Sequence, residues 1–275
     1  MLSLHTNAAA LSTQNALGGT QKALTTSMSR LGTGFRINSA MDDAAGLQIA
    51  TRLNAQSRGM AVAQRNTQNG ISMLQTAEGA LNEVSNMVLR MKDLATEAAN
   101  GTTSASDRTA LEAEFTELGN EITNIMTNTK FGGQVLLTGG KLAAAVNFQI
   151  GSAAVETYAF DASTQLGALD TAITALKGGD LDAAANAAIT LAETTVDAIG
   201  TLRSKLGSGA NRLDHVYNNL ANIRTNTEQA KGRIMDVDYA SETANMTTKQ
   251  MLMQASTSML KQSGSMSQLV MSLMQ

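Results

Sequence analysis

The 275-residue sequence has no cysteine, no proline and no tryptophan, and aromatic residues make up only 3% of it. Without cysteine the chain forms no disulfide, no thiolate metal site and no cysteine nucleophile. Without proline, no helix in the chain carries the cost of about 3 kcal/mol that one internal proline would impose. A compact single core normally uses more large aromatic side chains, whereas seams between long helices need only Leu, Ile, Val, Met and Ala. These absences favour long helices.

Charge is also scarce, and the formal net charge is only -3 with no basic block. This balance argues against nucleic acid as a partner. No uninterrupted apolar run approaches the ~18 residues of a membrane span, so we expect no membrane insertion. The first residues, Met1–His5, lack the charged region and the continuous apolar region of a standard cleaved secretory signal.

The two ends are nearly uncharged but carry apolar rows at helical spacing. Residues 1–29 contain only Lys22, and residues 245–275 contain only Lys249 and Lys261. Apolar stripes without charges invite association, so we expect the ends to pack against each other and against copies of the chain. The expected self-assembly residues are Leu17, Leu24, Met28, Leu31, Leu252, Met259, Met266 and Leu273.

Between the ends, apolar residues repeat every seven positions, which indicates coiled-coil seams. Two interleaved rows of four cover one segment: Leu74, Leu81, Val88 and Ala95, with Ala77, Val84, Met91 and Ala98. A second long row follows later: Ile199, Leu206, Leu213, Leu220, Thr227 and Ile234. Two glycines, Gly207 and Gly209, are the expected weak point of that later helix.

The middle of the chain differs, because glycine pairs separate short runs and Val146, Phe148 and Ile150 alternate as in a strand. We expect two or three short antiparallel strands within 133–161. The predicted fold class is therefore mainly α: long antiparallel coiled-coil helices from both chain ends, with a small β-hairpin insertion in the middle.

The sequence offers no set of residues suited to catalysis, a cofactor or a metal. Asp42-Asp43 sits where a first helical turn would use acidic residues to offset the helix dipole. Asp236, Asp238 and Glu242 lack the glycine-bearing loop of a calcium site. An enzyme would need a pocket with convergent titratable groups, so we expect no enzyme, no cofactor and no metal.

Several long motifs resemble those of bacterial flagellins, in order and at both ends. The N-terminal ones are residues 29–46 (SRLGTGFRINSAMDDAAG), 65–72 (RNTQNGIS) and 75–83 (QTAEGALNE). The C-terminal ones are residues 233–242 (RIMDVDYASE) and the tail 269–275 (LVMSLMQ). The resemblance covers about residues 1–140 and 185–275. Only a short segment separates these halves, which resembles a minimal flagellin with little or no outer domain.

The resemblance implies a layout in which helices from both ends form an inner tube and the next helices form a rod-like core outside it. Four segments follow. Residues 1–40 are the N-terminal inner-tube segment, and 41–180 are the N-terminal half of the core with its hairpin near 133–161. Residues 181–235 are the C-terminal half of the core, and 236–275 are the C-terminal inner-tube segment.

The resemblance also implies a function: a structural subunit exported from the cell that polymerises into the flagellar filament used for swimming, with an extracellular location. The implied partners are copies of the chain, a flagellar export chaperone, the type III export apparatus, and hook-associated and cap proteins. Two alternatives stay open. One is a hook–filament junction protein of the same superfamily, and the other is an unrelated coiled-coil sensor or adhesin.

One further partner follows from the resemblance alone. The segments Leu89–Leu94 and Glu112–Glu114 resemble the surface that a vertebrate flagellin-sensing Toll-like receptor recognises. Arg90, Leu94 and Glu114 match the recognised pattern. By heptad position alone, Arg90 lies off the seam and the other two flank it, as ordinary surface residues of a helix pair would.

Overall fold

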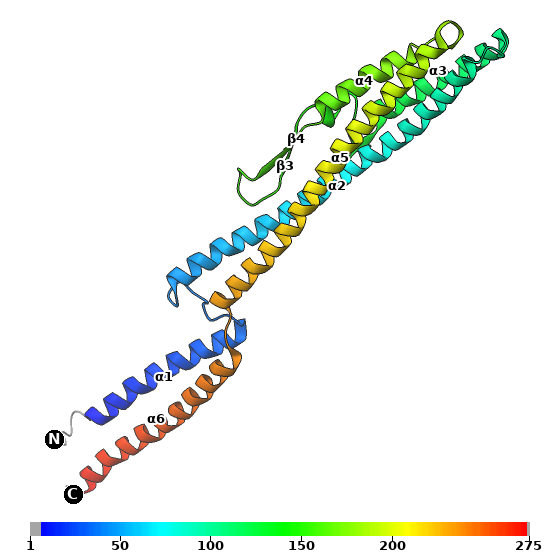
Figure 1. Cartoon of the computed structure of the whole chain (residues 1–275). Coiled ribbons are helices and arrows are strands. Elements are labelled where there is room, and N and C mark those ends of the chain that lie inside the picture. Colours follow the sequence, from blue (N-terminus) through cyan, green and yellow to red (C-terminus); the bar gives the residue numbers. More distant parts are fainter. Residues whose placement is uncertain (1–6, 274–275) are drawn as a thin grey trace. The chain divides into compact units, whose positions relative to one another are not determined.

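The computed structural model describes the backbone of residues 7–273 and side chains through residue 265. These residues form six long helices and two short pairs of strands (Figure 1). The helices are α1 (Ala8–Thr33), α2 (Ala44–Ala98), α3 (Ala105–Asn128), α4 (Ser163–Lys177), α5 (Leu181–Met235) and α6 (Tyr239–Leu273). The strands are β1 (Lys130–Phe131), β2 (Gln134–Val135), β3 (Val146–Gln149) and β4 (Thr157–Phe160), with a 3₁₀ turn at Lys141–Ala143. The predicted mainly α class with a small β insertion is confirmed.

The chain divides into two compact units. The terminal unit contains residues up to Ala55 and residues from Asn226 onward, and the central unit is Gln56–Thr225. The long helices α2 and α5 each contribute to both units. The loop that joins α1 to α2, residues 34–43, contains the expected boundary at residue 40 and lies inside the terminal unit.

In the terminal unit, α1 and α6 pack side by side and antiparallel (Figure 1). At one end the Asn7 amide donates a hydrogen bond to the Ser263 carbonyl at 3.0 Å. At the other end the Arg30 guanidinium lies 3.9 Å from the Glu242 carboxylate. The pairing brings the first helix of the sequence against the last one.

A short backbone bridge fixes the end of α1 to the start of α6. Gly34 ends α1 with a φ of 75°, a conformation that glycine adopts without steric cost. The Arg36 N–H then donates to the Met235 carbonyl at 2.6 Å, and the Val237 N–H donates to the Gly34 carbonyl at 3.0 Å. Both ends of the helix pair are therefore held by hydrogen bonds between α1 or its following loop and the C-terminal part of the chain.

In the central unit, α2 and α5 run antiparallel, as three cross-helix contacts show. Arg224 donates to Gln64 at 3.0 Å, Arg203 pairs with Glu78 at 2.7 Å, and Lys92 pairs with Glu193 at 3.0 Å. The eight predicted seam residues of α2 are 0–3% exposed and belong to the main hydrophobic core. The later heptad row is also buried from Ile199 to Leu213. Heptad spacing therefore identified the core correctly.

Two capping patterns start the helices. Ser104 and Asp107 form a full capping box at the start of α3, each side chain accepting from the other residue's backbone N–H. The residues before α2 are arranged differently. The Asp42 carboxylate accepts from the Asn38 and Ser39 N–H groups within the loop, and Asp43 accepts from Gly46 at 2.8 Å. Asp43 is therefore the residue that caps α2.

The strands form two separate antiparallel pairs. β1 and β2 join through Gly132-Gly133, whose positive φ values of 56° and 81° suit a two-residue hairpin turn. β3 pairs with β4 in the register Val146–Phe160 to Gln149–Thr157. The alternating residues Val146 and Phe148 lie in β3, and β2, β3 and β4 all fall within the expected 133–161, whereas β1 lies just before it.

The β3–β4 hairpin packs on the central helices through glycines. Phe160 is 1% exposed, and its ring lies where a Cβ on Gly209 would stand 2.5 Å away. A Cβ added at Gly70 would similarly lie 3.0 Å from Cε1 of the Phe148 ring. The helix α5 continues through Gly207 and Gly209, the expected weak point. The non-helical residue inside α5 is Ala184 instead.

Candidate self-assembly surface

The faces that α1 and α6 turn toward each other follow alternating spacings of three and four residues. On α1 the covered or half-covered residues at this spacing include Thr13, Leu17, Thr20, Leu24, Ser27 and Leu31. On α6 they include Glu242, Met246, Lys249, Met253, Ser256, Leu260 and Ser263. Seven of these thirteen residues are small, polar or charged. The contact within one chain therefore has the spacing of a coiled coil but a mixed composition.

The predicted C-terminal row lies on a different side of α6. Leu252 is 47% exposed and Met259 is 63% exposed, with Ala255 exposed between them. We call Leu252, Ala255 and Met259 the outer row. The side chains of Met266 and Leu273, which extend the row in sequence, lie outside the described residues. α6 thus carries apolar residues on the side that α1 does not cover.

The predicted N-terminal row is split between the two environments. Leu24 is buried, and Leu17 and Leu31 are half-buried on the side that faces α6. Met28 is exposed at the edge of the same side, about 40° around the helix from Leu24. We expected the two rows to pack against each other and against copies of the chain. Within a single chain, Leu17, Leu24 and Leu31 are covered, whereas the outer row stays open.

A weak ion pair links the two helices. Glu242 is buried, and its partner Arg30 approaches it only to 3.9 Å. The Nε atom of Arg30 is also buried and has no hydrogen-bond partner among the described residues. An ion pair with this geometry contributes little net stability after desolvation. Apolar contacts and backbone hydrogen bonds therefore account for most of the pairing.

The start of α6 is held by an acidic cap. The Ser241 hydroxyl donates to the Asp238 carboxylate at 2.7 Å, and the Ser241 and Ala240 N–H groups also donate to it. These hydrogen bonds lower the pKa of Asp238 below its ordinary value of 3.8, with the Ser241 hydroxyl the largest cause. The carboxylate is therefore a helix cap and not an acid–base group near neutral pH.

The three residues of the receptor-like pattern lie in different environments. Arg90 and Glu114 are exposed and form a two-pronged pair, with Arg90 Nε and Nη2 at 2.9 and 2.7 Å from one Glu114 oxygen. The hydrogen bond to Glu114 is the main reason that the pKa of Arg90 is raised. Leu94 is 0% exposed and lies in the main core. Only two of the three side chains are therefore available on the surface of the central unit.

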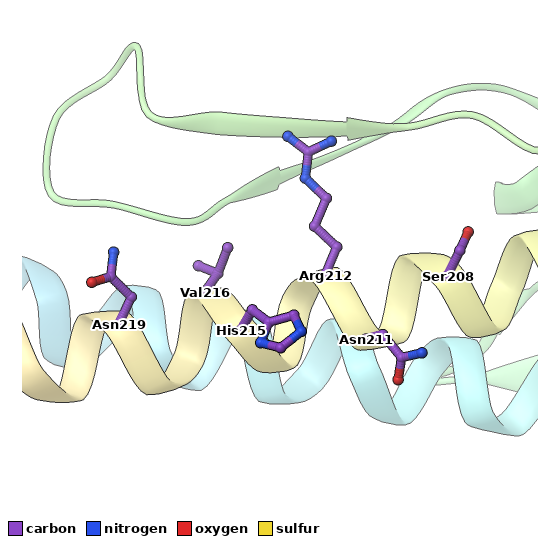
Figure 2. A pocket seen from close by; sticks show the side chains of 6 residues that line it. All are labelled: Ser208, Asn211, Arg212, His215, Val216 and Asn219. Carbon is purple, nitrogen blue, oxygen red and sulfur yellow. The ribbon is translucent and has the colours of Figure 1, made fainter.

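A groove in the central unit runs along one side of α5, beside the β3–β4 hairpin (Figure 2). Its lining residues are Ser208, Asn211, Arg212, His215, Val216 and Asn219. Arg212 reaches toward the hairpin and stacks over the Tyr158 ring, 4.2 Å from its centroid. His215 is exposed, as its position beside the seam residue Leu213 predicts. No carboxylate lines the groove to orient the imidazole, so it has no catalytic pairing.

Within the part of the chain that the structure describes, no group of three or more His, Asp or Glu side chains is arranged to hold a metal ion. Among the same residues, no helix is both long enough and apolar enough to cross a bilayer.

Comparison with known families gives matches at both ends. Residues 4–141 match the family described as "Bacterial flagellin N-terminal helical region". Residues 189–274 match the "Bacterial flagellin C-terminal helical region". The unmatched middle, residues 142–188, contains the β3–β4 hairpin and α4.

Individual relatives agree with these matches. Flagellin A of Vibrio anguillarum is 35% identical, with all of both chains covered. That alignment spans 379 positions, so this 275-residue chain has gaps at about a hundred of them. The crystal structure of Bacillus cereus flagellin is 36% identical with a TM-score of 0.50, covering 57% of this chain and 88% of that one. The Vibrio parahaemolyticus protein described as a "putative flagellar hook-associated protein" shares the fold, at 18% identity and a TM-score of 0.57, covering 71% of this chain and all of that one.

Proposed function

Because this chain belongs to the bacterial flagellin family, we propose that it polymerises through its terminal helices α1 and α6 to build the flagellar filament. Flagellins are structural proteins and not enzymes, and this chain is a short member without a large outer domain. The proposed product is a helical homopolymer outside the cell, and its biological role is swimming motility.

The observation that carries the proposal is the position of the outer row. α6 is already covered on one side by α1, yet Leu252 and Met259 remain about half exposed or more on another side. The last 31 residues contain only two charged side chains to keep this helix apart from other apolar surfaces. A helix with apolar residues on more than one side is normally buried on more than one side. Because flagellins assemble with copies of themselves, a second copy of this chain is the proposed partner for that surface.

Burial of the outer row supplies a modest driving force at each contact. Covering the exposed parts of Leu252 and Met259 would contribute roughly 1 kcal/mol each, since full burial of such a side chain is worth about 1.5–3 kcal/mol. One contact of this size would not hold two subunits together. If a surface of one copy meets a different surface of the next, the contact repeats without closing, and a filament results.

Supporting partners follow from the same proposal. A subunit that assembles outside the cell must be exported, which requires a flagellar export chaperone and the type III export apparatus. Growth at the tip of the filament requires cap and hook-associated proteins. The family membership supports this group of partners.

The first experiment tests whether assembly depends on the outer row in particular or on any exposed apolar residue. The double variant Leu252→Asn/Met259→Asn should remain a folded, helical monomer by circular dichroism but fail to sediment as filaments after salting. Val155→Asn is the matched control, because Val155 is 88% exposed and lies far from α6 in the sequence. The control should assemble normally. Normal filaments from the double variant would refute the assignment of α6.

A truncation test addresses the ends as a whole. Removal of residues 1–30 or of 246–275 should leave a soluble, partly helical protein that forms no filaments. Either truncated chain polymerising as the full chain does would contradict the proposed role of the terminal helices.

The junction-protein alternative has support from fold alone, through the likeness to the hook-associated protein. A junction protein makes a short collar, whereas a filament subunit elongates. Electron micrographs of the purified protein after salting distinguish the two. Long filaments exclude the alternative, and short rings or no polymer would favour it.

We also propose that the free subunit is sensed by the vertebrate flagellin-sensing Toll-like receptor through Arg90 and Glu114. The exposed, two-pronged pair between them supports this assignment. Leu94 would act indirectly, by fixing α2 in the core. In a receptor reporter assay, Arg90→Ala and Glu114→Ala monomers should signal less than wild type. Arg203→Ala, which breaks a similar two-pronged pair with Glu78 outside the two receptor-like segments, is the matched control. No response to wild-type monomer would end the proposal.

A further inference from the structure

The sulfur chemistry of this chain rests entirely on thioethers, because it has sixteen methionines and no cysteine. Four of the methionines with described side chains lie on α6, and they fall into two environments. Met246 and Met253 are half-buried toward α1. Met251 and Met259 are 58% and 63% exposed on the uncovered part of the helix. Oxidant in solution therefore reaches the second pair first.

We infer that Met251 and Met259 are oxidation sites through which peroxide blocks assembly of the free subunit. The inference rests on the proposed function, in which copies of the chain cover the exposed part of α6 where both sulfur atoms lie. Hydrogen peroxide is the reagent class. The methionine sulfur attacks one peroxide oxygen and the O–O bond breaks. The products are a sulfoxide and one water, with sulfur losing the two electrons that the peroxide gains.

The consequence follows from the polarity of the product. A sulfoxide oxygen accepts hydrogen bonds strongly, and an apolar contact between helices offers it no donor. Water satisfies the same oxygen while the subunit is free, so oxidation leaves the α1–α6 pair intact. Assembly should therefore suffer while the folded monomer does not. Subunits already in a filament are shielded, because the neighbouring copy excludes peroxide from this face.

The test uses the full chain and two leucine variants, since leucine keeps the size and apolar character of methionine but has no sulfur. Met251→Leu/Met259→Leu removes the proposed sites. Met41→Leu is the matched control, because Met41 is 96% exposed in the loop before α2 and should oxidise at least as readily. Each monomer is treated with peroxide, quenched with catalase and mixed with filament seeds. Sedimentation then gives the critical concentration, and peptide mass spectrometry locates the added oxygen.

In wild type and Met41→Leu, oxidation should raise the critical concentration ~tenfold or more, the effect expected from burying one unpaired polar oxygen. The double leucine variant should change much less, and methionine sulfoxide reductases should restore the wild type. Equal loss in the double variant, or protection by Met41→Leu, would overturn the inference. If untreated wild-type protein does not assemble, the proposed function itself fails, and that outcome is visible before any peroxide is added.

Discussion

Two glycines of α5, Gly207 and Gly209, lie two positions apart and should respond in opposite directions to the same substitution. Nothing lies within 4 Å of a Cβ added to Gly207, whereas one added to Gly209 meets Phe160 Cε2 at 2.5 Å and Leu74 Cδ1 at 3.3 Å. Phe160 is buried and cannot swing aside into solvent. Alanine favours a helix over glycine by roughly 0.5–1 kcal/mol at either site. At Gly209, overpacking costs about 1–3 kcal/mol against that gain.

Gly207→Ala should therefore stabilise the protein by about 0.5–1 kcal/mol, and Gly209→Ala should destabilise it by about 1–2 kcal/mol net. For a unit of this size, each 1 kcal/mol shifts Tm by about 2–4 °C. Thermal unfolding of the monomer, followed by circular dichroism, should show Gly207→Ala above wild type and Gly209→Ala below it. A higher Tm for Gly209→Ala would mean that the hairpin does not pack against α5 through Phe160, and the reasoning would be refuted.

Three further changes test other parts of the fold. Ser104→Ala removes the capping box of α3 and should lower the free energy of unfolding by about 1 kcal/mol, measured by urea denaturation. Phe160→Ala empties the site beneath the hairpin and should cost about 3–5 kcal/mol in the same assay, so a loss under 1 kcal/mol would contradict its burial. The lowered pKa of Asp238 means that its cap stabilises α6 above the ordinary value of 3.8, and the stabilisation is lost as pH falls through the lowered folded-state value. An acid titration of helix content should therefore show a smaller loss below pH 3.8 in Asp238→Ala than in wild type.

Periodicity in the sequence identified the central seam because one geometric rule governs it. Residues seven apart in a helix lie on nearly the same face, so a four-repeat apolar row such as Leu74 to Ala95 can hardly be placed anywhere but in a core. Alternation at Val146 and Phe148 located β3 for the same reason, with a period of two. The flagellin motifs at both ends added the family, which periodicity alone could not supply.

Spacing along the sequence does not say which distant residues lie opposite a given position. Leu94 flanks the seam by sequence position, yet it is completely buried because α3 and α4 add residues to the same core. By sequence, Gly209 is only an expected weak point of its helix, and the structure adds that Phe160, from a strand some fifty positions earlier, fills the space beside it. In both cases the contacting residues are far apart in the sequence, so a local sequence pattern cannot reveal the contact.

By itself, the sequence determined that the ends are helical, apolar and nearly uncharged, and hence that they need a partner. Only the tertiary structure decided which apolar row meets α1 and which remains open. α6 has methionines and leucines on more than one side, so its composition does not decide which side faces α1. Backbone hydrogen bonds at Arg36 and Val237, with the Asn7–Ser263 contact at the far end, fix the rotation of the helix. That rotation turns Met246 and Met253 toward α1 and leaves Leu252 and Met259 exposed.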